Sequence, residues 1–204
     1  MYVEVLCKNI QRNIDHIIDK GLLSNDGLRK YFDYNVHSIL QYCLIRVDVD
    51  LYPIPEYKVK LKVPIDRFKI DERFKQKKKN RYQKVIKVDV AYLKNSDILG
   101  VGEVFTPDEI HGVLKSEELP GGPWMTPRHK IEHLITHNKP RFLIVVNVIS
   151  TYPPWRDVKQ RPLDEWEEAW IRFIEEVCKQ QNVECSHIII KNVRDIKYYS
   201  YIPS

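Results

Sequence analysis

The chain has 204 residues, with 33 lysines and arginines against 28 aspartates and glutamates, for a formal net charge of +5. Its four cysteines lie far apart without a CxxC pair, and no apolar run approaches the roughly 18 residues of a membrane span. Composition therefore argues against a disulfide framework, a cysteine zinc site and a membrane protein. We expect a cytoplasmic protein with one domain over residues 1–204, divided into an N-terminal helical region (1–52) and an α/β core (53–204).

Two amphipathic helices are predicted at the N-terminus. In the first, apolar residues recur at helical spacing from Leu6 to Ile18, and Gly21 is a plausible stop. The cluster Ser24-Asn25-Asp26 is typical of a helix start, and a second apolar stripe continues to Cys43. The alternating segment 46–51 is predicted to be a short strand or an extended lead into the sheet.

A strand with a basic outer face is predicted at 57–65, where valine and leucine alternate with lysine. The following segment, 67–81, is highly charged and predicts a surface loop. Its basic residues either keep the loop solvated or form an arm that contacts nucleic-acid phosphates, and both interpretations stay open. These residues are Lys75, Lys77, Lys78, Lys79 and Arg81.

A β-hairpin is predicted from residue 85 to residue 106, with turn residues at 94–97. If 95–97 form a three-residue loop, Lys94 lies opposite Ile98, and Asp89 then lies directly opposite Glu103. Cross-strand partners have Cβ atoms about 5 Å apart, so both carboxylates could share one hard cation. A change of one residue in the loop would place the two carboxylates on opposite faces of the hairpin.

The second half of the chain predicts helices around a buried strand. Thr106-Pro107 and Thr126-Pro127 are each typical of a helix start. The apolar run 142–149 predicts a central strand buried on both faces, and a long helix is predicted from about Asp164. The alternating run 195–202 predicts a strand that completes the sheet or pairs with its copy in a homodimer. We therefore expect an α/β fold with a mixed central sheet and helices on both faces.

Three histidines follow Pro127 at helical spacing, namely His129, His133 and His137. With Glu132, the first two match the HxxEH pattern of inverted zinc peptidases. The sequence leaves three interpretations open, which are a half-exposed structural face, contact with phosphate near the hairpin, and zinc hydrolase chemistry.

The carboxylate pair and the order of elements around it resemble the PD-(D/E)XK nuclease superfamily over about residues 55–195. In that family, an Asp and a Glu on successive strands hold a divalent metal. The resemblance implies a restriction-endonuclease-like core, with Asp89, Glu103 and the carbonyl of Val104 as ligands of Mg²⁺ or Mn²⁺. The chain departs from the family at Phe105, where a lysine is expected. Some members supply this lysine from the following helix, which here would be Lys130 or Lys115.

These observations together favour a metal-dependent nuclease in which Asp89, Glu103 and Lys130 are catalytic. The expected partner is a nucleic acid, with DNA favoured over RNA. Two alternatives remain, which are a nucleic-acid-binding protein that has lost catalysis at Phe105 and the zinc-dependent hydrolase.

Overall fold

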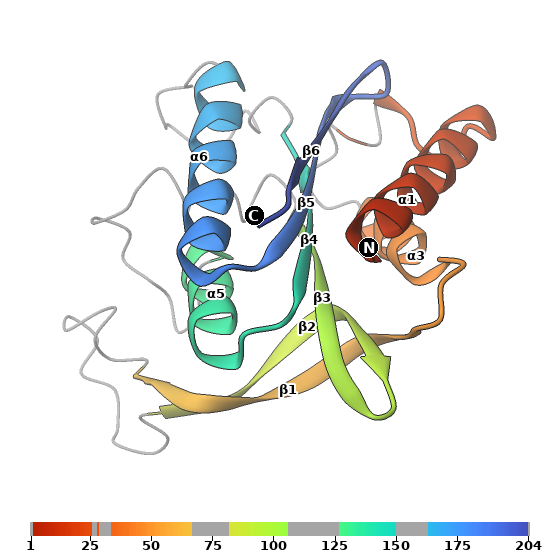
Figure 1. Ribbon diagram of the computed structural model, residues 1–204. Helices are drawn as coiled ribbons and strands as arrows, with labels where there is room; N and C mark the ends of the chain where they lie inside the picture. The colour runs from red at the N-terminus through yellow and green to blue at the C-terminus, as the bar shows by residue number, and fades with distance from the viewer. Residues whose placement is uncertain are drawn as a thin grey trace.

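Figure 1 shows the computed structural model, which describes residues 2–25, 28, 34–66, 82–105, 127–149 and 163–203. Its helical elements include a π-helical turn η1 and four α-helices, which are α1 (Tyr2–Asp19), α3 (Tyr34–Ile45), α5 (Pro127–His133), η1 (Leu134–Asn138) and α6 (Leu163–Gln181). Its strands are β1 (Tyr52–Asp66), β2 (Tyr82–Lys94), β3 (Asp97–Phe105), β4 (Phe142–Val148), β5 (Glu184–Asn192) and β6 (Asp195–Tyr201).

The strands form one six-stranded sheet in chain order, β1-β2-β3-β4-β5-β6. The pairs β3–β4 and β4–β5 are parallel, and the other three pairs are antiparallel. Helices α1 and α3 cover one face, whereas α5 and α6 cover the other (Figure 1). The predicted α/β fold, with a mixed sheet and helices on both faces, is confirmed.

The apolar core has two layers, one on each side of the sheet. All residues of β4 are buried, as its sequence, apolar except for Asn147, predicts. Val145 belongs to the layer under α5 and α6, which contains Trp170, whereas Ile144 belongs to the layer under α1 and α3. Each fully buried aliphatic side chain contributes about 1.5–3 kcal/mol. The two faces of β4 thus hold both helical layers against one strand.

Close packing between β3 and β4 requires a glycine. A Cβ atom on Gly100 would lie 2.1 Å from the Phe142 ring, far inside van der Waals contact. Phe142 pairs with Gly100 in the parallel register and is itself buried. Gly100 therefore makes room for a large side chain in the α1–α3 layer.

The hairpin differs from the prediction in its loop but has the predicted register over residues 90–92. Lys94 pairs with Asp97, so the turn has two central residues, Asn95 and Ser96, with φ of 50° and 71°. Positive φ at both residues is the type I′ geometry of tight hairpins. Leu99 is an extra residue, because Leu93 pairs with Ile98 and Tyr92 with Gly100. This bulge offsets the shorter loop and restores the register expected farther from the turn.

Other boundaries also depart from the sequence prediction. Strand β1 begins at Tyr52 despite Pro53 and Pro55, which an edge strand tolerates. Segment 46–51 is not a strand but an irregular connection. The helix expected after Thr106 and the charged segment 67–81 lie outside the described residues.

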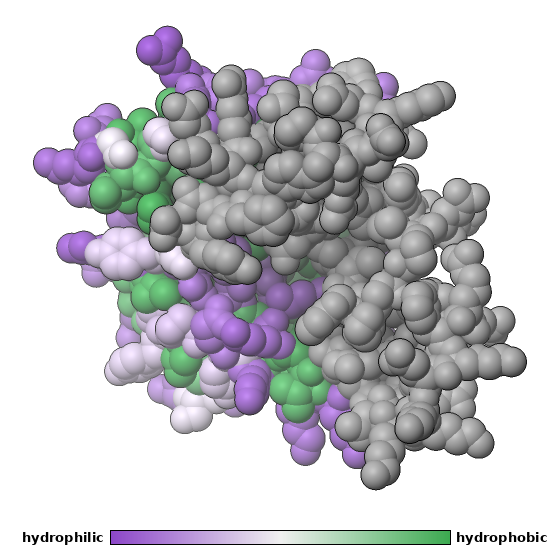
Figure 2. Space-filling view, turned by 180° about the vertical axis from the view of Figure 1, so that it is seen from behind, coloured by the Kyte–Doolittle hydropathy of each residue, from purple (hydrophilic) through white to green (hydrophobic). Residues whose placement is uncertain are grey.

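On the face seen in Figure 2, the described hydrophobic side chains form small separate patches among hydrophilic ones. Within the described ranges, no helix is long and apolar enough to cross a membrane.

Candidate functional site

Asp89 lies where the alternation of β2 shifts by one residue. Residues two apart normally share a face of a strand, yet Val88 belongs to the α5–α6 layer and Val90 to the α1–α3 layer. The neighbouring pairs place Glu56 of β1 opposite Asp89, and Glu56 has a φ of 55°. This left-handed conformation costs about 1–2 kcal/mol in a residue with a side chain. The backbone around Asp89 and Glu56 therefore departs from regular strand geometry.

The carboxylate of Asp89 bridges to β3. The pair Val90–Gly102 puts Asp89 and Glu103 at the next position of the same register, as predicted. Regular pairing between the strands ends there, and the amide N–H of Val104 instead donates to Asp89 Oδ2 at 2.7 Å. Val104 is thus brought to the site through its amide, while the proposed role of its carbonyl stays a prediction.

Glu103 is a buried carboxylate with a cationic partner from α5. Its side chain is 1% exposed, and Lys130 Nζ lies 2.6 Å from Glu103 Oε2. Lys130 is 18% exposed, so its ammonium lies near the protein surface. The structure therefore brings together Asp89, Glu103 and Lys130, the three residues that the sequence singled out.

Two residues of α3, His37 and Gln41, complete the surroundings of Asp89. His37 Nε2 lies 3.4 Å from Asp89 Oδ2. Gln41 Nε2 donates to the backbone carbonyl of Asp89 at 2.9 Å and to Glu56 Oε1 at 3.0 Å. Sequence reasoning missed both residues. Their i, i+4 spacing puts them on one helix face, but nothing in the sequence shows that this face meets β2.

The electrostatic environment keeps Asp89 ionised. Burial alone would raise its pKa, but the hydrogen bond from His37, the charge of Lys130 and the Val104 amide together lower the pKa below its usual value. Asp89 is therefore a carboxylate at neutral pH, as a cation-binding or proton-accepting group must be.

Acidic oxygens and cationic groups converge at this point from both faces of the sheet. Within the described ranges, no three His, Cys, Asp or Glu side chains are grouped closely enough to hold a metal ion. Lys130 instead provides the positive charge next to Glu103. Binding of a cation by the two carboxylates therefore stays a prediction.

The histidine motif has a different setting. His133 Nε2 is hydrogen-bonded to the backbone carbonyl of Val63, and the His133 ring lies 4.4 Å from that of His137. Burial and the neighbouring His137 lower the pKa of His133 although the Val63 bond opposes them. In this conformation the bonded nitrogen is unavailable to zinc. For His129 only the backbone is described.

The basic residues 75–81 and Lys115 lie outside the described residues. The predicted phosphate-binding role of Lys75, Lys77, Lys78, Lys79 and Arg81 and the alternative lysine at 115 stay predictions.

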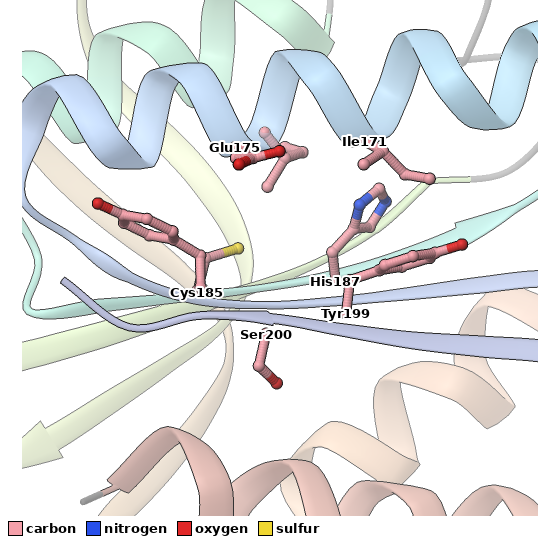
Figure 3. A pocket seen from close by; sticks show the side chains of 8 residues that line it. Ile171, Glu175, Cys185, His187, Tyr199 and Ser200 are labelled. Carbon is pink, nitrogen blue, oxygen red and sulfur yellow. The ribbon is translucent and has the colours of Figure 1, made fainter. Parts of the chain in front are cut away.

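A separate pocket of about 190 Å³ lies between α6 and strands β5 and β6. Ile171 and Glu175 line it from α6, opposite His187 and Tyr199 of the sheet, while Ser200 points to the other side (Figure 3). The pocket is mainly apolar. Two strands, β3 and β4, separate β5 from the strand that carries Asp89, so this pocket is not part of the carboxylate site.

The polar residues beside this pocket are paired with one another. His187 is buried, and its Nε2 lies 2.8 Å from Asn147 Nδ2. Glu167 accepts hydrogen bonds from Lys197 at 2.7 Å and Tyr199 at 2.8 Å, and it also pairs with Lys191. Burial alone would raise the pKa of Glu167, but the three donors lower it to about 2. Glu167 therefore ties α6 to the edge of the sheet.

Comparisons with models of protein families, with curated proteins and with solved structures found no significant match to this chain.

Proposed function

We propose that the protein is a metal-dependent nuclease that hydrolyses phosphodiester bonds in nucleic acid. One observation carries the proposal. Asp89 and Glu103 each follow the Val90–Gly102 pair, the point at which β2 and β3 stop pairing, and Lys130 Nζ lies 2.6 Å from Glu103 Oε2. Two carboxylates and one amine at a strand junction are the groups that the PD-(D/E)XK resemblance requires.

The donor set fits a hard divalent cation. Asp89, Glu103 and the carbonyl of Val104 would hold Mg²⁺ or Mn²⁺ through oxygen atoms, the ligands that these ions prefer. When bound, the ion lowers the pKa of a coordinated water and offsets charge on the scissile phosphate. His37 either orients Asp89 through their 3.4 Å contact or adds an imidazole ligand.

Lys130 is assigned the role of the missing family lysine. Phe105, which stands at the usual position, is buried and stacks on Trp170 with ring centroids 5.5 Å apart. A lysine there would enter the apolar core under α6. Lys130 reaches Glu103 from α5 instead, and its ammonium can orient the attacking water or stabilise negative charge on the phosphate.

The alternative is a nucleic-acid-binding protein with the same fold and no catalysis. The Phe105 departure favours it, because the ammonium of Lys130 then serves only to neutralise Glu103. The two functions differ in a single property, which is cleavage in the presence of a divalent metal.

Further parts of the proposal concern partners and location. DNA is our favoured substrate. Four free cysteines, three of them buried, suit a reducing compartment such as the cytoplasm. Strand β6 lies at one end of the sheet and pairs with β5 alone among the described strands, so its outer edge suits pairing in a homodimer.

The test is cleavage of DNA and RNA by the purified protein with Mg²⁺, with Mn²⁺ and with EDTA. We expect cleavage only with metal, and we expect Asp89→Ala and Glu103→Ala to abolish it while circular dichroism remains unchanged. Asp97→Ala is the matched control, because it removes an exposed carboxylate from the turn of the same hairpin. Full activity in EDTA, or undiminished activity in both site variants, would refute the metal site. Folded protein without any cleavage would support the binding alternative.

A further inference from the structure

Strands β1 and β2 form a ribbon with one buried face and one basic face. Val59, Leu61, Ile86 and Val88 turn toward the core under α5 and α6. The lysines that alternate with them along the two strands are exposed. We call these four the lysine face, namely Lys58, Lys60, Lys62 and Lys87.

The lysine face places like charges together. Lys58 pairs directly with Lys87 across the two strands, and like charges at such positions are destabilising. Glu56 is the one acidic residue in 52–63 and 84–88, and it forms an ion pair with Lys87. Lys62 Nζ lies 3.5 Å from the carbonyl of Asn138. The four lysines of this face therefore exceed the acidic charge of segments 52–63 and 84–88.

The position of the face links it to the carboxylate site. Residues two apart on a strand are separated by about 6.7 Å, so Lys58, Lys60 and Lys62 form a straight row of about 13 Å. Lys87 comes two residues before Asp89 on β2. The row thus runs along the ribbon toward Asp89.

We propose that the lysine face binds the phosphate backbone of a nucleic acid and leads it to the carboxylate site. The inference deepens the proposed function and rests on it, because cleavage at Asp89 and Glu103 defines where the backbone ends up. Lysines are point charges on flexible stems, so they bind phosphates without reading bases. Binding by this face should therefore be independent of sequence and sensitive to salt.

The test compares two triple variants with the same loss of charge. One is Lys58→Gln, Lys60→Gln, Lys62→Gln on the lysine face. The control is Lys8→Gln, Lys20→Gln, Lys179→Gln, three exposed lysines on α1, at its C-terminal end and on α6. Fluorescence anisotropy with labelled single-stranded DNA, duplex DNA and RNA, all in EDTA, measures binding without cleavage over a series of salt concentrations.

We expect the lysine-face variant to bind at least tenfold more weakly and to flatten the slope of log affinity against log salt by roughly 2 to 3, or 0.7–0.9 for each lost phosphate contact. The control should keep the wild-type slope. Equal slopes in the two variants, or no binding by the wild type, would overturn the inference.

Cleavage with Mg²⁺ is assayed separately. Wild-type protein that binds through these lysines but never cleaves would refute the proposed nuclease and leave the binding face intact. If it does cleave, the lysine-face variant should raise KM more than it lowers kcat.

Discussion

Replacing Lys130 by methionine removes the cation beside Glu103 and keeps the length of the side chain. The Glu103 carboxylate is 1% exposed and has Lys130 Nζ at 2.6 Å. Removing one partner of a fully buried ion pair costs about 3–5 kcal/mol, and because Lys130 is partly exposed we expect about 2–3 kcal/mol in metal-free protein. The measurement is urea unfolding of wild type and Lys130→Met in EDTA.

A divalent metal should partly replace the missing ammonium. If Asp89 and Glu103 hold the ion, Lys130 competes with it for the same carboxylate. Excess Mg²⁺ should then stabilise Lys130→Met more than it stabilises the wild type, because binding to the folded state alone raises the free energy of unfolding. Cleavage by the variant should fall by a factor on the order of 100 or more, as expected when charge stabilisation is lost from the transition state.

Two further variants control this prediction. Lys130→Arg retains the charge and should keep most of the metal-free stability. The double variant Glu103→Gln, Lys130→Met removes both charges and should be more stable than the sum of the single changes predicts. Wild-type stability in Lys130→Met, or purely additive effects in the double variant, would refute the idea that this pair balances a buried charge.

Two more predictions concern stability. Gly100→Ala places a Cβ atom 2.1 Å from the Phe142 ring and should lower the free energy of unfolding by about 1–3 kcal/mol or more. Gly102→Ala, whose closest contact would be 3.2 Å, should lower it less. Equal losses of stability in urea unfolding of the two variants would contradict the packing argument. Burial lowers the pKa of His187 from 6.5 to about 3 although the charge of Glu167 opposes it, so between those values the unfolded chain binds a proton that the folded protein does not. Stability should therefore fall as the pH drops below 6.5, by at most about 1.4 kcal/mol per unit. His187→Gln should flatten this dependence, and an unchanged slope in the variant would remove the assignment.

Strong local patterns made much of the fold predictable. The mostly apolar run of β4 identifies a strand buried on both faces, because only a central position can bury both sides. The amphipathic stripes of α1 and α6 likewise identify helices. The register that puts Asp89 and Glu103 at facing positions was predicted from a three-residue loop, yet over residues 90–92 it arises from a two-residue turn and a bulge at Leu99. The sequence contains no clear sign of that bulge. The predicted loop length was therefore wrong, although the register over residues 90–92 agrees with the prediction.

The candidate site was only partly predictable. Asp89 and Glu103 followed from local pairing, and Lys130 followed from a family resemblance. His37 and Gln41 could not be found, because their contacts with Asp89 span 52 and 48 residues of sequence and depend on how α3 packs on the sheet. The shift of alternation at Asp89 could not be predicted either, since it lies opposite a left-handed residue, Glu56, where the sequence has no glycine.

The central claim is that Asp89 and Glu103 together hold a divalent metal, and a crystal structure with Mn²⁺ tests it most directly. Anomalous diffraction locates the ion independently of activity. The account predicts a peak between the two carboxylates, with Lys130 Nζ moved away from Glu103 Oε2. Crystals in saturating Mn²⁺ with no peak there, and with the Lys130–Glu103 pair intact, would contradict it.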